Sequence, residues 1–548
     1  MSAYFAMAAV MPSAVPAGQD DAGAALAVRV AAGPGLWEDQ GWLGELRRDG
    51  LVTELLAAGV IERAVAGGGH GCRLERALTA AMTLLCVITA CLFTGQGYDL
   101  VLARVFRMPG TRVRPGTRTP TGPALSRARA RLGEDTARRA FELDAARGDV
   151  PLAAGGTAFG LELVIFDGTT LDLFACPELA AEFGVPEGGT NPKLRAVALL
   201  QAGTMRWKAA ALGGYHDGEN ALCDRLEGAL GPGQLSLADR GFFSMDRWLR
   251  FSGTGAHLLW RVKNSAKSVP FRRLRMLKDG SELVLLRESG NMLGKRRRQA
   301  GDRTLARLPD TLARLVCFTV LTRTRRGRAK TAQVRVLTTL LDPDAFPARE
   351  IAALYASRWQ VETAFLHLKR TVRGAGRALR GRSPVLARQE AWALFLVHNM
   401  IAALAARAAA TAGTGLSAVS FTAVLSLVRE HVTADACCPH CGYRPASAAD
   451  PLGPLTTAIA AQPLARENRK RTSGRTSAER TRWPTEEAAY DLTIIPSNLP
   501  ESRHKSEKLR AVGPELDDMN ASSQSADPRG SREHPAGSLR WDGPHRAA

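Results

Sequence analysis

Apolar and polar positions divide the chain into a helical first part and a later part in which strands and helices alternate. From about Leu36 to Leu143, apolar residues recur every three or four positions, as in "GPALSRARARLGEDTARRAFEL", which predicts helices. From Leu161 onward, shorter apolar runs such as "LELVIF" and "LRAVALLQ" are typical of strands. The predicted order in this later part is strand, strand, strand, helix, strand, helix, strand.

Two of these strands end at an aspartate. The buried-strand pattern "LELVIFDGTTLDLF" reaches Asp167, and the short strand "GQLSLA" is followed at once by Asp239 and Arg240. A single aspartate at a strand end is more often a turn or capping residue than a ligand. The pair becomes informative only with a third acid later in the chain.

A helical pattern in "YASRWQVETAFLHLKR" supplies that acid. At about 100° per residue, four polar residues fall within a stripe of roughly 60°, and the apolar stripe lies roughly 80° away. The polar residues are Tyr355, Arg358, Glu362 and Lys369. Because this polar row borders the core, we expect Glu362 to line a cleft.

The order of elements and acids resembles the ribonuclease H-like α/β fold. In that fold the first and fourth strands are neighbours, so Asp167 and Asp239 would meet although 72 positions separate them. Three acids in one place repel each other unless a cation lies between them, which indicates Mg²⁺ or Mn²⁺. Two such ions support phosphodiester cleavage or exchange.

The distribution of charge indicates what kind of partner the protein binds. The 548 residues carry a formal charge of +20 with 45% apolar residues, enough for a large core and more than one domain. Residues 264–340 contain 19 Lys and Arg against five acids, a surplus of +14. Strand patterns in this segment alternate with "GKRRRQAGDR" and "RTRRGRAK", which we interpret as basic turns of an antiparallel β insert. The surplus favours nucleic acid over the alternative of solvated loops.

Three arginines in the helical part of the chain fit two different roles. Arg127, Arg129 and Arg131 lie beside apolar positions of a predicted helix, which fits a DNA-contacting helix and a plain surface helix equally well. We interpret Trp260, just before the basic segment, as a core residue.

Cysteine usage and hydropathy indicate the compartment. Nine cysteines in so long a chain are typical of reduced thiols in an intracellular protein, and the cytoplasm is the default. The apolar run from Leu78 to Phe93 is shorter than a bilayer requires and predicts a buried helix.

The signature of tyrosine, two residues, arginine, three residues, glutamate, six residues and lysine resembles that of the insertion-sequence-four family of bacterial DDE transposases. The stretches "FDGTT" and "ADRG" resemble the two aspartate motifs of that family. The resemblance extends from about Leu36 to Asn399, and the basic insert accounts for the 123 positions from Asp239 to Glu362.

The resemblance implies cut-and-paste transposition. Asp167, Asp239 and Glu362 would be catalytic and would hold two Mg²⁺ ions, or Mn²⁺ in their place. The DNA contacts would be Tyr355, Arg358, Lys369 and Arg240. The partners would be double-stranded DNA, as inverted-repeat ends and target, and a second subunit in a synaptic homodimer. The protein would be cytoplasmic, bacterial and associated with the nucleoid.

The expected division of the chain follows from these patterns. It comprises a disordered N-terminus (1–35), a helical N-terminal DNA-end-binding domain (36–150), a first part of the ribonuclease H-like catalytic domain (151–263), the basic β-rich insert (264–340), a second catalytic part with C-terminal helices (341–445) and a largely disordered tail (446–548). In "CCPHCG", Cys438 and Cys441 form half of a zinc site that His431 or His440 would have to complete.

Two rival functions share some of these features. Another ribonuclease H-like nuclease would need the acids but neither the tyrosine-to-lysine signature nor the basic insert. A transposase-derived DNA-binding protein without cleavage activity would not need all three acids.

Overall fold

The computed structural model describes residues 56, 59–69, 78–107, 118–153, 155–263, 271–323, 329–433, 452–461 and 490–495. The expected N-terminal segment 1–35 lies outside these residues, as does the cysteine pair Cys438 and Cys441.

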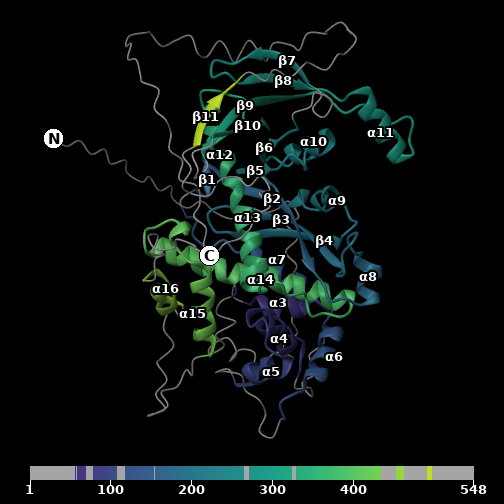
Figure 1. Ribbon diagram of the computed structural model, residues 1–548, viewed down its shortest axis with the longest axis vertical. Coiled ribbons are helices and arrows are strands. Elements are labelled where there is room, and N and C mark those ends of the chain that lie inside the picture. Colours follow the sequence, from purple (N-terminus) through teal and green to yellow (C-terminus); the bar gives the residue numbers. More distant parts are fainter. Residues whose placement is uncertain are drawn as a thin grey trace, which may run out of the picture.

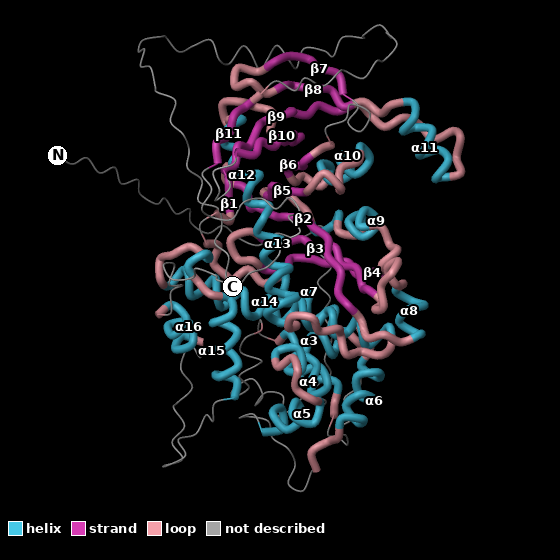
Figure 2. The backbone as a smooth tube through the Cα atoms, viewed as in Figure 1, coloured by secondary structure: helices cyan, strands magenta, loops and turns pink. Residues whose placement is uncertain are grey.

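A large mixed sheet runs through the described part of the protein (Figures 1 and 2). Its strands follow the order β4-β3-β2-β5-β6-β10-β9-β8-β7, with β1 beside β2 and β11 beside β9. The bounds are β1 Thr157–Ala158, β2 Leu161–Asp172, β3 Lys193–Gln201, β4 Arg206–Gly214, β5 Gln234–Ala238, β6 His257–Arg261, β7 Phe271–Met276, β8 Glu282–Leu286, β9 Thr311–Arg323, β10 Ala329–Thr338 and β11 Tyr490–Ile494.

The centre of the sheet follows the order of elements expected from the sequence. β2, β3 and β4 form an antiparallel meander, and β5 lies parallel to both β2 and β6. The helices α9 (Glu219–Asp224) and α10 (Met245–Gly253) separate β4, β5 and β6 along the chain, which confirms the predicted alternation. The short helix α8 (Pro177–Phe183), between β2 and β3, was not predicted. The architecture is therefore mixed α/β.

Helices from the first part of the chain gather at one end of the molecule, and the long helix α14 lies between them and the sheet (Figure 1). Their bounds are α3 Val60–Gly67, α4 Ala80–Leu92, α5 Tyr98–Arg107, α6 Gly122–Leu132, α7 Asp135–Ala145 and α14 Pro384–Thr411. α14 is long and apolar enough to cross a membrane by length and composition alone, but 89% of its most apolar window is buried within the protein. It therefore serves as a core helix.

One of the arginines of α6 is structural. Arg129 is buried and donates hydrogen bonds to the side chain of Gln389 (2.8 Å) and to the carbonyl of Leu386 (3.2 Å), both on α14. Arg127 and Arg131 are exposed. Arg129 therefore belongs to the contact between α6 and α14. The choice between a DNA-contacting helix and a plain surface helix concerns Arg127 and Arg131.

The segment that follows β10 changes helical pitch three times. α12 (Ala348–Tyr355) leads through a 3₁₀ turn (Ala356–Arg358) into α13 (Trp359–Leu366), and a π-helical turn (His367–Val372) ends it. The expectation of one regular α-helix is wrong, because the Arg373 amide bonds to the Leu368 carbonyl five residues back, at 3.0 Å. The regular count of 100° per residue therefore does not hold across the 3₁₀ turn or within the π-helical turn, which carries Lys369.

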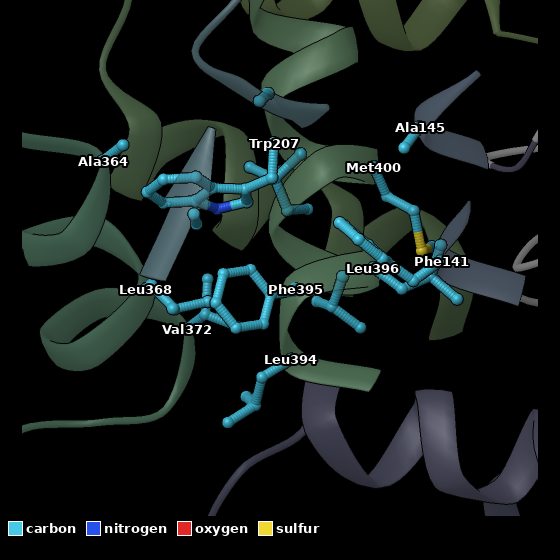
Figure 3. Packing of buried hydrophobic residues seen from close by; sticks show 14 of the residues in the cluster. Phe141, Ala145, Trp207, Ala364, Leu368, Val372, Leu394, Phe395, Leu396 and Met400 are labelled. Carbon is cyan, nitrogen blue, oxygen red and sulfur yellow. The ribbon is translucent and has the colours of Figure 1, made fainter. Parts of the chain in front are cut away.

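A packed aromatic cluster lies beneath this segment (Figure 3). Trp207 on β4 lies with its ring centroid 4.6 Å from that of Phe365 on α13 and 5.5 Å from that of Phe395 on α14. Leu368 and Val372, on the π-helical turn, are buried in the same cluster. Burial of each such side chain contributes about 1.5–3 kcal/mol, so the cluster fixes the inner face of the segment.

A buried arginine ties β9 to the start of α12. Arg314 donates to the hydroxyl of Ser281 (2.8 Å) and the carbonyl of Phe346 (2.6 Å), and it pairs with Asp279. The Asp279 carboxylate also accepts the amide of Ala348, the first residue of α12, at 2.9 Å. This network therefore sets where the Glu362-bearing segment begins.

Replacing Arg314 with methionine is expected to lower the free energy of unfolding by about 3–5 kcal/mol, because a carboxylate and several carbonyls lose their buried partner. The measurement is the urea midpoint. Arg287→Met is the matched control: its ion pair with Asp310 is about one-third exposed, and its loss is expected to change stability by about 1 kcal/mol or less. Equal midpoints for the two variants would contradict the role of the Arg314 network.

One expectation about a loop does not hold. "GKRRRQAGDR" was expected to be a turn, but Gly290–Ala300 forms the helix α11, because Ser289 caps its N-terminus and Gly301, at φ 68°, ends it. Within the tail 446–548, which was expected to be largely disordered, the structure describes α16 (Gly453–Ala460) and β11. β11 pairs with β9 from Phe318 to Thr322, whereas β8 pairs with the preceding half from Thr311 to Leu315. α15 (Phe421–Thr433) precedes α16.

Candidate active site

The two aspartates lie side by side on neighbouring strands. β2 and β5 run parallel and Phe166 pairs with Ala238, so the next residues, Asp167 and Asp239, lie at the same level of the sheet. The expectation that the first strand ends at Asp167 is wrong, because β2 continues to Asp172 through its pairing with β3. Their side chains are 23% and 35% exposed, respectively. Parallel pairing thus brings together two carboxylates that are 72 positions apart in the chain.

Arg358 links Glu362 to Asp167 through ion pairs with both carboxylates. Its Nη2 donates to Glu362 Oε1 at 2.9 Å, and its Nη1 lies 3.8 Å from Asp167 Oδ2. Burial by itself would lower the pKa of the guanidinium, but the Tyr355 hydroxyl and the nearby carboxylates outweigh burial and raise it. Arg358 therefore remains charged and neutralises the acidic group around it.

Burial and, to a smaller extent, the neighbouring carboxylates raise the pKa of Asp167. Burial is the largest cause that raises its pKa from 3.8 to about 6, and the negative charges of Glu362 and Asp239 add to it. The Arg358 guanidinium and the Gly168 amide, which donates to Asp167 Oδ1 at 2.8 Å, act in the opposite direction. The three acids are therefore near enough to influence one another.

The chemistry of the donor set suits a hard divalent cation, since all three groups offer carboxylate oxygens. Within the residues that the structure describes, however, no three His, Cys, Asp or Glu side chains converge closely enough to surround an ion. The Arg358 guanidinium lies between Asp167 and Glu362 and pairs with both. The carboxylates are thus compensated by arginine in this conformation.

The other predicted DNA contacts, Tyr355, Lys369 and Arg240, differ in burial and in the groups that they contact. Tyr355 is buried, and its hydroxyl donates to the carbonyl of Ala238 at 3.4 Å, so it contacts the end of β5 and not solvent. Lys369 donates from Nζ to Thr169 Oγ1 at 3.2 Å, farther along β2. Arg240 is exposed beside Asp239. In this conformation Lys369 and Arg240 border solvent, whereas Tyr355 and Arg358 lie within the site.

Sequence reasoning missed Arg261. Its Nη1 lies 3.5 Å from Asp239 Oδ1, so it compensates Asp239 as Arg358 compensates Asp167. The available signal was a basic residue at the end of the next parallel strand, because Trp260 pairs with Ala238 and Arg261 follows it. Trp260 itself is buried and donates to Ser236 Oγ at 3.2 Å, which confirms it as a core residue.

Two family profiles match the chain over separate segments. The "Transposase DDE domain" matches residues 193–400, which include Asp239 and Glu362. The "Insertion element 4 transposase N-terminal" family matches residues 48–142. The chain is a DDE transposase of the insertion-sequence-four family. It is therefore an enzyme with nuclease and strand-transfer activity.

Curated relatives agree with this family. The transposase is 28% identical over 370 residues to "Transposase InsG for insertion sequence element IS4" of Escherichia coli (strain K12), covering 65% of this chain and 77% of that protein. It is 30% identical over 199 residues to "Putative transposase InsL for insertion sequence element IS186A" of the same strain, covering 31% and 51%, respectively.

Among solved structures, the transposase has 10% identity and a TM-score of 0.35 to "Cryo-EM structure of piggyBac transposase synaptic complex with hairpin DNA (SNHP)". The match covers 70% of this chain and 79% of that one.

Proposed function

We propose that the transposase nicks double-stranded DNA at the inverted-repeat ends of its own element and transfers the freed 3′ ends to a target. Asp167, Asp239 and Glu362 are its catalytic carboxylates. The observation that supports this assignment is the parallel pairing of β2 with β5, which brings the two aspartates side by side. Glu362 is linked to Asp167 through Arg358, which forms an ion pair with each of them.

The same three carboxylates would hold two Mg²⁺ ions, with Mn²⁺ as a substitute. Bound metal would activate the attacking hydroxyl and stabilise the leaving oxygen in phosphoryl transfer. Arg358 has a complementary role, because it neutralises Asp167 and Glu362 in the present conformation. Once cations take over that neutralisation, its always-charged guanidinium is available to bind a DNA phosphate.

Tyr355 acts as a positioning residue, because its hydroxyl holds the Ala238 carbonyl immediately before Asp239. Lys369 and Arg240 border the site and would contact the DNA backbone, the first near Thr169 and the second beside Asp239. The expected contact of DNA with Tyr355 would require the side chain to leave its buried place.

The remaining parts of the chain have proposed roles in DNA binding. Helices α3–α7, within 36–150, would form the DNA-end-binding domain. The antiparallel strands β7–β10 and helix α11, within 264–340, would form the basic insert, supported by the charge surplus of +14 there. We infer a homodimer in the synaptic complex and a cytoplasmic, nucleoid-associated location, because both ends of one element must be held together on chromosomal DNA.

The proposed function is tested with DNA from both flanks of the gene. Purified transposase is expected to nick a supercoiled plasmid carrying these flanks in the presence of Mg²⁺, at the boundary of the inverted repeat, and EDTA is expected to abolish the reaction. The readout is conversion to nicked circle and mapping of the 3′ ends. Specific binding without nicking in either Mg²⁺ or Mn²⁺ would instead assign a transposase-derived DNA-binding protein.

A further inference from the structure

A second cluster of charge lies at the far end of β2, beyond the catalytic carboxylates. Asp172, the last residue of this strand, pairs in register with Lys193 at the start of β3. Lys193 Nζ lies 2.6 Å from Asp172 Oδ1, and Arg373 Nη2 lies 3.7 Å from Asp172 Oδ2. Lys369, bound to Thr169, approaches from the same helical segment as Arg373. Three cations thus surround one carboxylate.

Arg373 has unused hydrogen-bonding capacity. Its side chain is only 6% exposed, its Nε donates to the Lys369 carbonyl at a long 3.4 Å, and its contact with Asp172 is an ion pair at 3.7 Å. Within the described residues, its Nη1 is buried and has no hydrogen-bond partner. A buried donor left in this state lowers stability by about 1–3 kcal/mol, so an acceptor that reached this nitrogen would be bound favourably.

The backbone holds this arginine in place. The Leu379 amide donates to the Asp172 carbonyl at 2.8 Å, and Leu173 and Leu379 form a parallel β-bridge. The π-helical turn that precedes Arg373 is fixed by Leu368 and Val372 in the core (Figure 3). The cationic cluster is therefore built on two anchored segments and not on loose surface side chains.

The charges in the cluster do not balance. Burial lowers the pKa of Lys369, and the positive charges of Arg373 and Lys193 lower it further, whereas Asp172 only partly offsets them. Burial alone would raise the pKa of Asp172, but Lys193 and the other cations outweigh it and lower the pKa. A net excess of positive charge therefore persists around a carboxylate that is about one-third exposed.

We propose that Lys193, Lys369 and Arg373 form a subsite for a DNA backbone phosphate, and that Asp172 occupies the place of this phosphate in the free protein. The inference rests on the proposed function and extends it to residues outside the tyrosine-to-lysine signature. A phosphodiester offers oxygens to the free Nη1 of Arg373 and to both lysines, whereas Asp172 reaches only part of this set. Five strand residues separate Asp172 from Asp167, or about 17 Å, so this phosphate lies several nucleotides from the scissile bond.

Two substitutions test the subsite because they act in opposite directions. Lys193→Gln is expected to weaken binding of end DNA about 5–10-fold at 0.1 M salt and to reduce the slope of log K against log[salt] by about one. Asp172→Asn is expected to tighten binding, because the competing carboxylate is neutralised. Arg373→Gln should weaken binding like Lys193→Gln, and Lys193→Gln keeps the test valid if the buried arginine proves necessary for folding.

A second lysine–carboxylate pair on the same sheet provides the control. Lys208 and Glu162 lie 2.9 Å apart with side chains 25% and 21% exposed, similar to Lys193 and Asp172 at 30% and 35%. Lys208→Gln and Glu162→Gln are expected to leave DNA affinity and its salt slope unchanged.

The outcomes distinguish failure of the proposed subsite from failure of the proposed function on which it rests. If the wild-type protein nicks its ends but Lys193→Gln keeps the wild-type salt slope, the subsite is wrong and the function stands. Weaker binding by a folded Asp172→Asn protein would also overturn the proposal, because Asp172 would then assist DNA binding instead of competing with it. Failure of the wild-type protein to nick would reject the function, while the opposite shifts of the two variants on DNA would still support the subsite.

Discussion

Glu362→Gln is expected to bind transposon-end DNA within about threefold of wild type and to lose metal-dependent nicking by about a thousandfold or more. The substitution keeps the shape of the side chain but removes the negative charge. It leaves two carboxylates, which are insufficient to hold two cations against their mutual repulsion. The ion pair with Arg358 is also lost, and because Glu362 is 39% exposed, we expect little change in folding. The measurement is single-turnover nicking alongside a gel-shift affinity.

Glu350→Gln is the matched control for this experiment. Glu350 lies in the first turn of α12, on the same segment, and its side chain is exposed. The same chemical change there is expected to leave nicking unchanged. If Glu362→Gln nicked at the rate of Glu350→Gln, Glu362 would have no place in the catalytic group.

Asp167→Asn is expected to abolish nicking and, at pH 7.5, to stabilise the metal-free protein by about 1–3 kcal/mol. In the folded state the pKa of Asp167 is about 6, above its ordinary value of 3.8. The folded protein therefore binds this proton more tightly than the unfolded chain. The resulting stability is complete below about pH 4 and is lost as the pH rises through 6. Asparagine stays neutral throughout and avoids that loss.

The experiment compares urea midpoints of wild-type and Asp167→Asn proteins at pH 4 and pH 7.5 in EDTA. The two midpoints should nearly coincide at pH 4, and the variant should be the more stable protein at pH 7.5. Added Mg²⁺ should raise the midpoint of the wild type at pH 7.5 and leave that of the variant almost unchanged. A variant less stable than wild type at pH 7.5 without metal would contradict this account, because the carboxylate would then contribute net stability through Arg358.

The sequence predicted those parts of the site that depend on strand order. Asp167 and Asp239 each follow a run of apolar residues, and the alternation of strands and helices between them predicts parallel neighbours. The pairing of Phe166 with Ala238 confirms that prediction. Burial of Trp260 was likewise predictable, because it lies within an apolar strand next to these two.

Details that depend on side-chain packing could not be predicted from the sequence. The i,i+4 spacing of Arg358 and Glu362 is compatible with an ion pair between them. Nothing in the spacing of the signature indicates that Arg358 also approaches Asp167, since a guanidinium reaches in several directions from one backbone position. The π-helical turn follows from tertiary contacts of Leu368 and Val372, which override the regular period of the helix. β11 was missed because its five residues lie within a long polar region and gain their partner only from β9.

The pairing of β11 with β9 also affects the timing of folding during synthesis. β9 ends at residue 323, and β11 begins 167 residues later, at Tyr490. At the usual pace of translation, about 5–20 residues per second, this half of the β9 edge emerges roughly 8–33 seconds before its own partner exists. During that interval its amide and carbonyl groups are open to pairing with strands of other nascent chains. The last described strand thus completes the sheet only after a further 167 residues have followed β9 out of the ribosome.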